Sequence, residues 1–478
     1  MKERISLQDE MTEVHYDLPN RMIRFGFHGT KDDLCLVENQ YQCRLLIVDK
    51  VAFDCEESLE QLGKFLNNQD DLRNLPTMFV AIGVTNENEI RIIRSLDGVR
   101  PLYFADLNYG LVFSNRKKAI WAIGQTETES LNPGCMLIGR NGVWEHTQLR
   151  KHTLPKTPTK KMREDCLEDL KQKLHNSFSR FKSSDKCGVL FSGGVDSSLA
   201  AILTKNICED TVLVSAASPS SKDFQRTREI ARALSIDYRL FQFDVELVWR
   251  VLPEVIYAIE TSNRMDVEIA IPFFLAASKA KEEGCKLLVS GQGPDELFAG
   301  YARYERTFIE KGSESVRNEL WSDYSITHDT NIVRDVLAIE YHGVDSFFPY
   351  LDQEFGRSAF STPVEFFFNP HGTPSRKIIF RDLARELGLR EDIANTQKHA
   401  TQYSSGSSKA LQKAVMKNVQ DAEGISRRES HVLVQNVLHT IAKEIGIPTE
   451  NHFEIDMDMS PTQELIERVG RLPTSNLG

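Results

Sequence analysis

The stretch of this sequence best suited to chemistry is FSGGVDSS, residues 191–198. An apolar run precedes it and helix-favouring residues follow, which predicts a strand, a tight glycine turn and a helix N-terminus. Such a turn gathers backbone N–H groups and the positive end of a helix dipole around a small volume, which is an anion site. Three hydroxyls can add donors there, those of Ser192, Ser197 and Ser198.

A carboxylate lies among these anion-binding groups. Asp196 would repel a bound phosphate unless a magnesium ion bridged the two, and Mg²⁺ commonly takes one or two carboxylates together with phosphate oxygens. The loop SGQGPDE, residues 290–296, repeats the pattern with Gly291, Gly293 and Asp295. The sequence holds no G-x-x-x-x-G-K-S/T motif, so a Walker-type nucleotide site is excluded.

Both loops follow predicted strands in a region where strands and helices alternate. This alternation predicts a doubly wound parallel sheet, and its strands are expected at residues 188–191, 211–215, 238–244 and 285–290. A helix is expected after the last of them, at residues 294–310. Ligands of such sheets bind outside the carboxyl ends of the strands. Because both loops fall at such ends, we expect them to form one site.

The chain divides into three expected domains. Residues 1–155 carry short strand-like runs separated by turns and predict a mostly β domain. A segment rich in Pro and Thr, residues 152–161, is typical of a linker. An α/β domain is expected at 162–420 and a helical extension at 421–478, where apolar residues at helical spacing within 430–447 indicate core packing or a homodimer contact.

Composition narrows the class of protein further. The sequence has no apolar run of roughly 18 residues and no N-terminal h-region, so we expect a cytoplasmic protein without a membrane partner. A net charge of −11 disfavours broad nucleic-acid binding, which needs Lys and Arg against phosphates. The eight cysteines form no Cys-x-x-Cys pair, which fits reduced thiols rather than a zinc site.

Several motifs in a fixed order resemble a known family. SGGVDSS resembles the pyrophosphate loop (PP-loop) of the N-type ATP pyrophosphatases, and LLVSGQGPDELFAGYARY resembles the second signature of the asparagine synthetase family. Further matches follow in family order, and the resemblance covers residues 187–413: RD at 334–335, HGVDSFFPYLD at 342–352, RKIIFR at 376–381 and QKHATQYSSG at 397–406. The resemblance implies a PP-loop synthetase domain that uses ATP and Mg²⁺.

The resemblance also implies roles for individual residues. Asp196 and Asp295 match the magnesium-binding aspartates, Lys398 matches the lysine that stabilises the pentacovalent α-phosphate, and Lys377 matches a second lysine near the phosphates. The expected contacts of ATP and pyrophosphate are Leu190, Ser192, Gly193, Gly194, Asp196, Ser197, Ser198, Val214, Ser215, Ser290 and Gly291. Adenine is expected at Val214 and Ser215, and adenosine beside Leu190.

The sequence departs from the family pattern at three positions that the resemblance places near the carboxylate substrate. Gln292 stands where the family usually has a glutamate that serves amide formation, and glutamine cannot take a proton. The E-x-R-x-P pattern becomes Asp345 to Pro349, with Phe347 near the place of the arginine, and Thr396 stands near another family arginine. The resemblance nevertheless implies aspartate or a related acid as the carboxylate substrate.

The first domain resembles the class II glutamine amidotransferase half of the same enzymes, an Ntn-hydrolase-like fold. The resemblance rests on residues 94–120, which contain GVRPLYF, and on LNPGCML. The family nucleophile is a cysteine at the mature N-terminus, whereas this sequence begins Met1-Lys2-Glu3 and Cys35 lacks the expected flanks. We therefore expect no glutaminase activity, and ammonia supplied freely or by a separate glutaminase partner.

The resemblance implies an AMP-forming ligase that converts a small carboxylate into an acyl-adenylate and then an amide. Two other classes of function stay open. Loss of the nucleophile and the presence of Gln292 also fit a nucleotide-binding relative with a regulatory role, which would lack ATP–pyrophosphate exchange. A tRNA-modifying PP-loop enzyme is disfavoured by the acidic balance, and co-purifying RNA would favour it.

Overall fold

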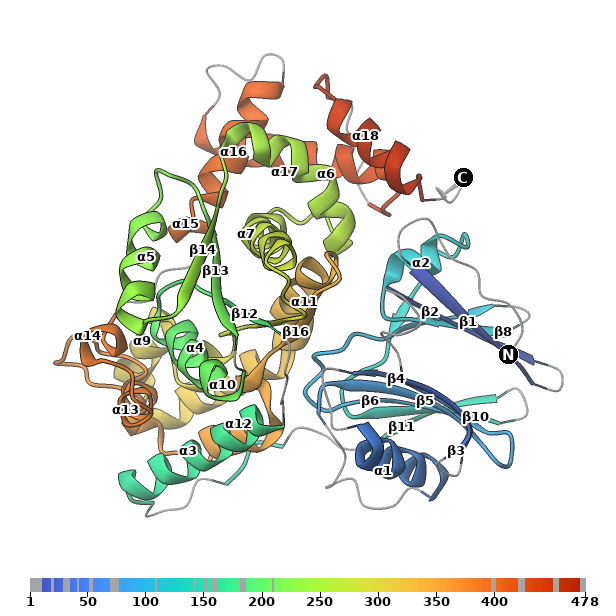
Figure 1. Cartoon of the computed structure of the whole chain (residues 1–478), viewed down its shortest axis with the longest axis horizontal. Helices are drawn as coiled ribbons and strands as arrows, with labels where there is room; N and C mark the ends of the chain where they lie inside the picture. The colour runs from blue at the N-terminus through green and yellow to red at the C-terminus, as the bar shows by residue number, and fades with distance from the viewer. Residues whose placement is uncertain are drawn as a thin grey trace.

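The structure is a computed structural model that describes most of the chain. Figure 1 shows two parts, a β-rich part within residues 11–149 and an α/β part within residues 161–472. The described residues are 11–18, 21–28, 35–40, 43–50, 55–68, 77–107, 110–140, 143–149, 153–156, 161–180, 186–208, 210–396, 401–419, 426–449 and 455–472.

The β-rich part is built on two sheets. The first has the order β1-β2-β8-β7-β9 and is antiparallel except between β2 and β8; its strands are β1 Met11–Leu18, β2 Arg21–His28, β7 Tyr103–Leu107, β8 Gly110–Ser114 and β9 Glu129–Ser130. The second is antiparallel with the order β11-β10-β6-β5-β4-β3; its strands are β3 Cys35–Gln40, β4 Cys43–Lys50, β5 Phe79–Thr85, β6 Ile90–Arg94, β10 Cys135–Arg140 and β11 Val143–Gln148. A mostly β N-terminal region is thus confirmed.

The α/β part contains a five-stranded parallel sheet with the order β14-β13-β12-β15-β16. Its strands are β12 Cys187–Leu190, β13 Thr211–Ala217, β14 Asp237–Gln242, β15 Leu287–Val289 and β16 Asp345–Phe347. The chain runs outward from β12 through β13 to β14 and then returns to place β15 on the other side of β12. This reversal is the topological switch point of a doubly wound sheet, and it confirms the predicted fold class.

Helices surround this sheet, and α1 Cys55–Asn68 and α2 Lys117–Trp121 belong to the β-rich part (Figure 1). The α-helices of the α/β part are α3 Arg163–Ser179, α4 Val195–Ile207, α5 Asp223–Leu234, α6 Val245–Ile259, α7 Arg264–Glu282, α8 Pro294–Leu297, α9 Ala302–Lys311, α10 Ser313–Thr327, α11 Val333–Glu340, α12 Gln353–Phe360, α13 Ile378–Glu386, α14 Glu391–Ala394, α15 Thr401–Ser404, α16 Ser407–Asn418, α17 Arg427–Ile445 and α18 Ser460–Val469. None of the helices in the described ranges is long and apolar enough to cross a membrane.

The helical pattern after β15 is interrupted in the structure. The sequence predicts a helix through residues 294–310, whereas α8 ends at Leu297 and α9 begins at Ala302. Ala299 has a φ of +59°, a left-handed conformation that a continuous helix cannot contain. The Gly300 N–H instead donates to the carbonyl of Asp295 at 2.8 Å. The break therefore brings the 299–300 backbone against Asp295.

A buried ion-pair network joins the two parts. Glu340, at the end of α11, pairs with Arg100 and, at 3.0 Å, with Arg116. Arg100 also lies 3.5 Å from Asp49. All four side chains are less than a tenth exposed, so breaking one pair leaves buried charge behind. Glu340 therefore contributes buried ion pairs between the two parts.

The C-terminal helices pack on the α/β part. Helix α17 contacts α6 and α16, and its buried positions recur at helical spacing: Val434, Val437, Leu438, Ile441 and Ala442. These side chains belong to the main hydrophobic core, so the amphipathic pattern predicted within 430–447 reflects core packing. The division of the chain at 155, 162 and 421 stays a prediction, because 157–160 and 420–425 are outside the described residues.

Candidate active site

The two glycine loops meet at the switch point between β12 and β15. A Cβ at Gly291 would lie only 3.0 Å from the backbone nitrogen of Ser197, so the second loop contacts the first turn of α4 directly. Gly193 has a φ of +68°, which favours glycine in the turn before that helix. The structure therefore places the two loops in contact, as expected from their positions at the strand ends, and their joint function stays a prediction.

Hydrogen bonds fix the shape of the first loop. The Ser192 N–H donates to Ser197 Oγ at 3.2 Å, and Ser197 Oγ donates to the carbonyl of Gly194 at 3.3 Å. The Ser215 hydroxyl, on β13, donates to the carbonyl of Phe191. Because α4 begins at Val195, Asp196 lies in its first turn, at the positive end of the helix dipole.

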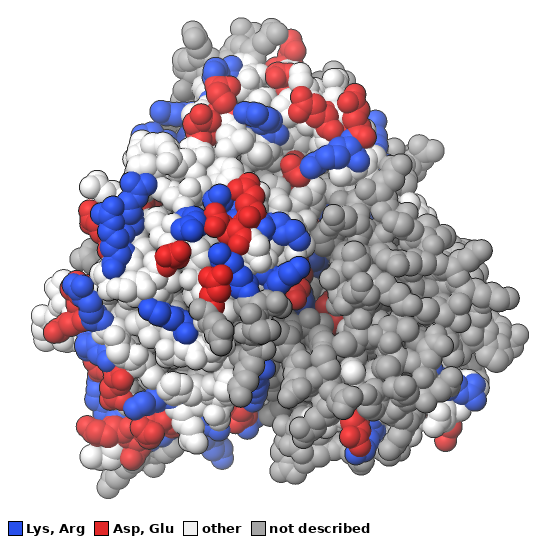
Figure 2. Space-filling model, in the orientation of Figure 1, with Lys and Arg blue, Asp and Glu red and all other residues white. Residues whose placement is uncertain are grey.

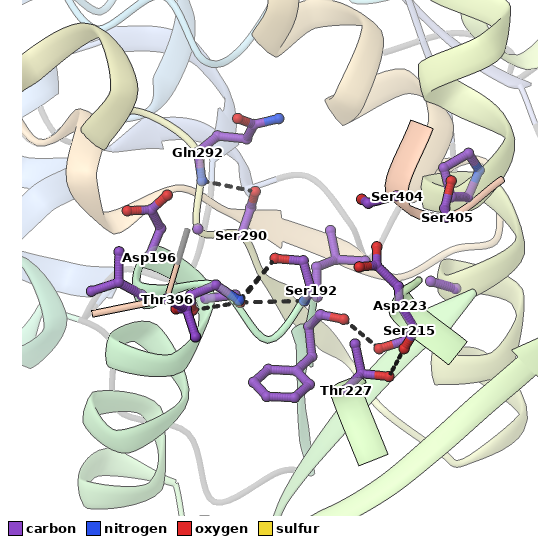
Figure 3. Close-up of a pocket in the computed structure, with 18 of the residues that line it drawn as sticks. Ser192, Asp196, Ser215, Asp223, Thr227, Ser290, Gln292, Thr396, Ser404 and Ser405 are labelled. Atoms are coloured by element: carbon purple, nitrogen blue, oxygen red, sulfur yellow. Dashed lines mark hydrogen bonds between the residues drawn. The ribbon is translucent and has the colours of Figure 1, made fainter. Parts of the chain in front are cut away.

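The loops border a cavity of about 120 Å³ (Figure 3). Most of the residues that the sequence singled out line it: Leu190, Ser192, Gly194, Asp196, Ser197, Val214, Ser215, Ser290, Gly291, Gln292, Asp295 and Lys377. Gly193 and Ser198 are not among the lining residues; Ser198 is fully buried within α4. Lys398 lies outside the described residues, and its role stays a prediction.

Lys377 joins the two predicted metal-binding aspartates. Its Nζ donates to both carboxylate oxygens of Asp196 at 2.8 Å and lies 2.7 Å from Asp295 Oδ1. Asp196 is on α4, Asp295 on α8, and Lys377 immediately precedes α13. Two carboxylates that share one cationic nitrogen are close enough to share a metal ion, so these residues fit the Mg²⁺ that the resemblance implies.

Gln292 is held by an acidic residue behind the cavity wall. Its Nε2 donates to Asp335 Oδ2 at 2.9 Å. Asp335 is fully buried and also accepts from Arg334 at 2.8 Å. Burial raises the pKa of Asp335 above its ordinary value, although the Arg334 charge opposes the rise. The amide at 292 therefore supplies a neutral donor to a buried carboxyl group.

The opposite wall contains polar residues that belong to none of the predicted motifs. Figure 3 shows Asp223, Thr227, Ser404 and Ser405 on the side of the cavity away from Asp196. Thr227 Oγ1 and the Tyr238 hydroxyl lie 2.6 Å apart, and the Ser405 carbonyl accepts from the Ser218 N–H at 2.9 Å. Asp223 was predictable, because it opens the helix that follows the loop after β13, at the edge of the sheet where ligands bind.

Arginines on two helices complete the cavity lining. Arg226 Nη2 donates to the carbonyl of Ser192 at 2.9 Å and thereby supports the first loop. Arg381 Nε donates to the carbonyl of Arg376 at 2.9 Å, and its Nη1 donates to that of Thr396 at 3.0 Å. These bonds occupy the Arg381 guanidinium with backbone, and burial lowers its pKa from the ordinary value. Thr396 also lines the cavity, so the predicted departure at this position falls within the site.

Several glutamine-hydrolyzing asparagine synthetases are similar to this chain. The protein described as asparagine synthetase 1 of Methanocaldococcus jannaschii is 29% identical over 382 residues, which cover 70% of this chain and 70% of that protein. The enzyme of Brassica oleracea is 26% identical over 297 residues, 59% of this chain and 49% of that protein. The chain therefore spans about half the length of this plant relative.

Solved structures of two synthetases also align with the chain. The NMN synthetase of Francisella tularensis has a TM-score of 0.28 and 11% identity, covering 59% of this chain and 95% of that one. The NH₃-dependent NAD synthetase of Campylobacter jejuni has a TM-score of 0.24 and 12% identity, covering 62% of this chain and all of that one.

The family model described as asparagine synthase matches residues 169–315 and 309–445. These segments span more than half of the chain and contain β12 to β16, both glycine loops and Lys377. The cavity at the switch point thus lies within the matched region. The chain belongs to the asparagine synthase family of ATP-dependent ligases.

Proposed function

We propose that this protein activates a small carboxylate with ATP and transfers the acyl group to ammonia. A carboxylate oxygen of the substrate attacks the α-phosphorus, and the bond to the pyrophosphate oxygen breaks. The nitrogen of ammonia then attacks the acyl carbon of the adenylate, AMP leaves, and one proton is released. The observation that carries the proposal is the pair of glycine loops with Asp196, Asp295 and Lys377 around one cavity.

The first loop supplies the groups that would hold pyrophosphate. Ser192 in the loop and Ser197 in the first turn of α4 line the cavity, and the N-terminus of a helix favours phosphate. Asp196 and Asp295 would hold Mg²⁺, which neutralises phosphate charge when bound. Lys377 would add a positive charge close to the same phosphate groups. The cavity wall formed by Val214, Ser215 and Leu190 would accept the adenosine moiety.

Ammonia is proposed as the nitrogen donor because two cysteines of the β-rich part, Cys43 and Cys135, are unsuited to attack. The Cys43 and Cys135 side chains are buried, and burial raises the pKa of Cys43 to about 11. A thiol with such a pKa carries almost no thiolate at neutral pH, and the thiolate is the nucleophile. A separate glutaminase could supply the ammonia to this ligase.

ATP–pyrophosphate exchange tests the proposal directly. The purified chain is incubated with ATP, Mg²⁺, labelled pyrophosphate and each member of a panel of carboxylates that includes aspartate. Label should enter ATP only with the true acyl substrate, and free ammonia should then yield the amide and AMP. Exchange absent for the whole panel, with ATP still bound, would instead indicate a nucleotide-binding regulatory relative.

RNA association is the second outcome to examine in the same preparation. Among the described residues on the face in Figure 2, Lys and Arg are interspersed with Asp and Glu rather than gathered in one basic area. Nucleic-acid surfaces usually concentrate positive charge. RNA that co-purifies and survives a wash at high salt would favour the tRNA-modifying alternative.

A further inference from the structure

Lys377 is placed as an internal counter-ion for two carboxylates. Its side chain is 2% exposed, that of Asp295 is 6% exposed and that of Asp196 is 17% exposed. Its Nζ lies within 2.8 Å of oxygens from both aspartates. Two carboxylates brought together away from water repel each other strongly unless a cation lies between them. The ammonium group occupies that position.

The local backbone is built for this contact. Lys377 itself has left-handed angles, φ 58° and ψ 30°, which are uncommon for a residue other than glycine. A Cβ at Gly300 would lie 1.8 Å from Asp295 Oδ1 and 2.5 Å from Lys377 Cε. Gly300 therefore leaves the space in which the lysine and Asp295 meet. The left-handed backbone of Lys377 and the absence of a side chain at Gly300 therefore both favour the ion pair between Lys377 and Asp295.

A divalent metal and the Lys377 ammonium need the same carboxylate oxygens. Mg²⁺ binds oxygen at about 2.1 Å, and a metal so placed between Asp196 and Asp295 would collide with Nζ. Like charges at such a distance also repel. The ammonium must move before the metal binds, and its new partner must be an anion. The phosphates of a nucleotide are such an anion at the adjoining loop.

We infer that Lys377 competes with the divalent metal for Asp196 and Asp295, so that the metal binds tightly only when nucleotide phosphates draw the lysine away. The nucleotide step rests on the proposed function, whereas the competition itself does not. The lysine thus keeps the aspartates paired before substrate arrives and couples metal binding to ATP binding. Metal affinity without nucleotide is the property that reveals this coupling.

Titration with Mn²⁺, a paramagnetic substitute for Mg²⁺, tests the competition without any turnover. Free Mn²⁺ is measured by electron paramagnetic resonance in the absence of nucleotide. We expect weak binding by the wild type, unchanged weak binding by Lys377→Arg, and binding at least about tenfold tighter by Lys377→Met. Lys417→Met is the matched control, because it removes a lysine from an exposed pair with Glu246 and should bind Mn²⁺ like the wild type.

A second measurement covers the case in which Lys377→Met folds poorly. Its thermal midpoint should be lower than that of the wild type in EDTA and should recover with Mg²⁺ alone, because the metal replaces the lost cation. Tight Mn²⁺ binding by the wild type without nucleotide would overturn the inference, as would Lys377→Met binding no tighter than wild type. Absence of pyrophosphate exchange would count against the proposed function but leave the Mn²⁺ comparison interpretable.

Discussion

Gln292→Glu should destabilise the protein in a pH-dependent way, because residue 292 faces a buried carboxyl group. The wild-type Nε2 lies 2.9 Å from Asp335 Oδ2, so a glutamate would place two carboxyl oxygens about 3 Å apart. At an effective dielectric of about 20, two such charges repel by roughly 5 kcal/mol. Arg334 offsets part of this repulsion, but it already pairs with Asp335 and, at 3.3 Å, with Asp266.

The pair can avoid the repulsion by keeping one proton. The ordinary pKa of glutamate is about 4.3, so keeping it protonated costs about 1 kcal/mol at pH 5 and about 5 kcal/mol at pH 8. A carboxyl pKa raised in the folded state makes the folded protein bind more protons than the unfolded chain, so stability falls as pH rises. The destabilisation should therefore grow from about 1 kcal/mol at pH 5 to about 5 kcal/mol at pH 8.

Unfolding midpoints from pH 5 to pH 8 measure this effect. Gln292→Glu combined with Asp335→Asn exchanges the amide and the acid, and it should restore most of the stability. Gln463→Glu introduces the same charge at an exposed position of α18 and should leave the midpoint unchanged. A midpoint of Gln292→Glu equal to the wild-type value at pH 8 would refute the reasoning, as would a double variant no more stable than the single one. At acidic pH, where the variant folds, pyrophosphate exchange should persist.

Three further changes test other parts of the structure. Asp295→Asn should abolish Mg²⁺-dependent pyrophosphate release with an unchanged circular dichroism spectrum, since losing a metal ligand costs several kcal/mol of transition-state stabilisation; release at the wild-type rate would contradict the metal assignment. Gly300→Ala should lower exchange at least about tenfold, because its Cβ would displace Asp295 and Lys377; full exchange would show that the contact is dispensable. Burial raises the pKa of Glu340, but Arg100 and Arg116 lower it below the ordinary value, so its stabilisation is present above the unfolded pKa and lost as pH falls through the folded one. Glu340→Gln should cost about 3–5 kcal/mol at neutral pH and weaken the acid dependence of unfolding, whereas an unchanged denaturation curve would contradict the network.

The sequence predicted the elements better than the contacts between distant residues. Strands β12 and β15 and the loops after them were predictable, because apolar runs followed by glycines and a helix are local patterns. The contact of Lys377 with Asp196 joins residues that are 181 positions apart in the sequence, and no local sequence pattern predicts a contact over that separation. The helix break at Ala299 was also missed, since alanine ordinarily favours a helix and tertiary contacts impose its left-handed conformation.

The contacts of Phe347 and Gln292 give a physical interpretation of two positions at which the sequence departs from the family pattern. Phe347, near the place of a family arginine, is buried and packs edge-to-face on Phe178, with ring centroids 6.1 Å apart. Arg334, near Gln292, is committed to Asp335 and Asp266. A second carboxylate on the substrate, as in aspartate, would need a cation to balance its charge in a partly buried site. Because the Gln292 amide is hydrogen-bonded to Asp335 and Arg334 is paired with Asp335 and Asp266, we expect an acyl substrate with a neutral polar group at this wall to support exchange better than a dicarboxylate does. The exchange panel should therefore include monocarboxylates and amino acids without a second acid, alongside aspartate.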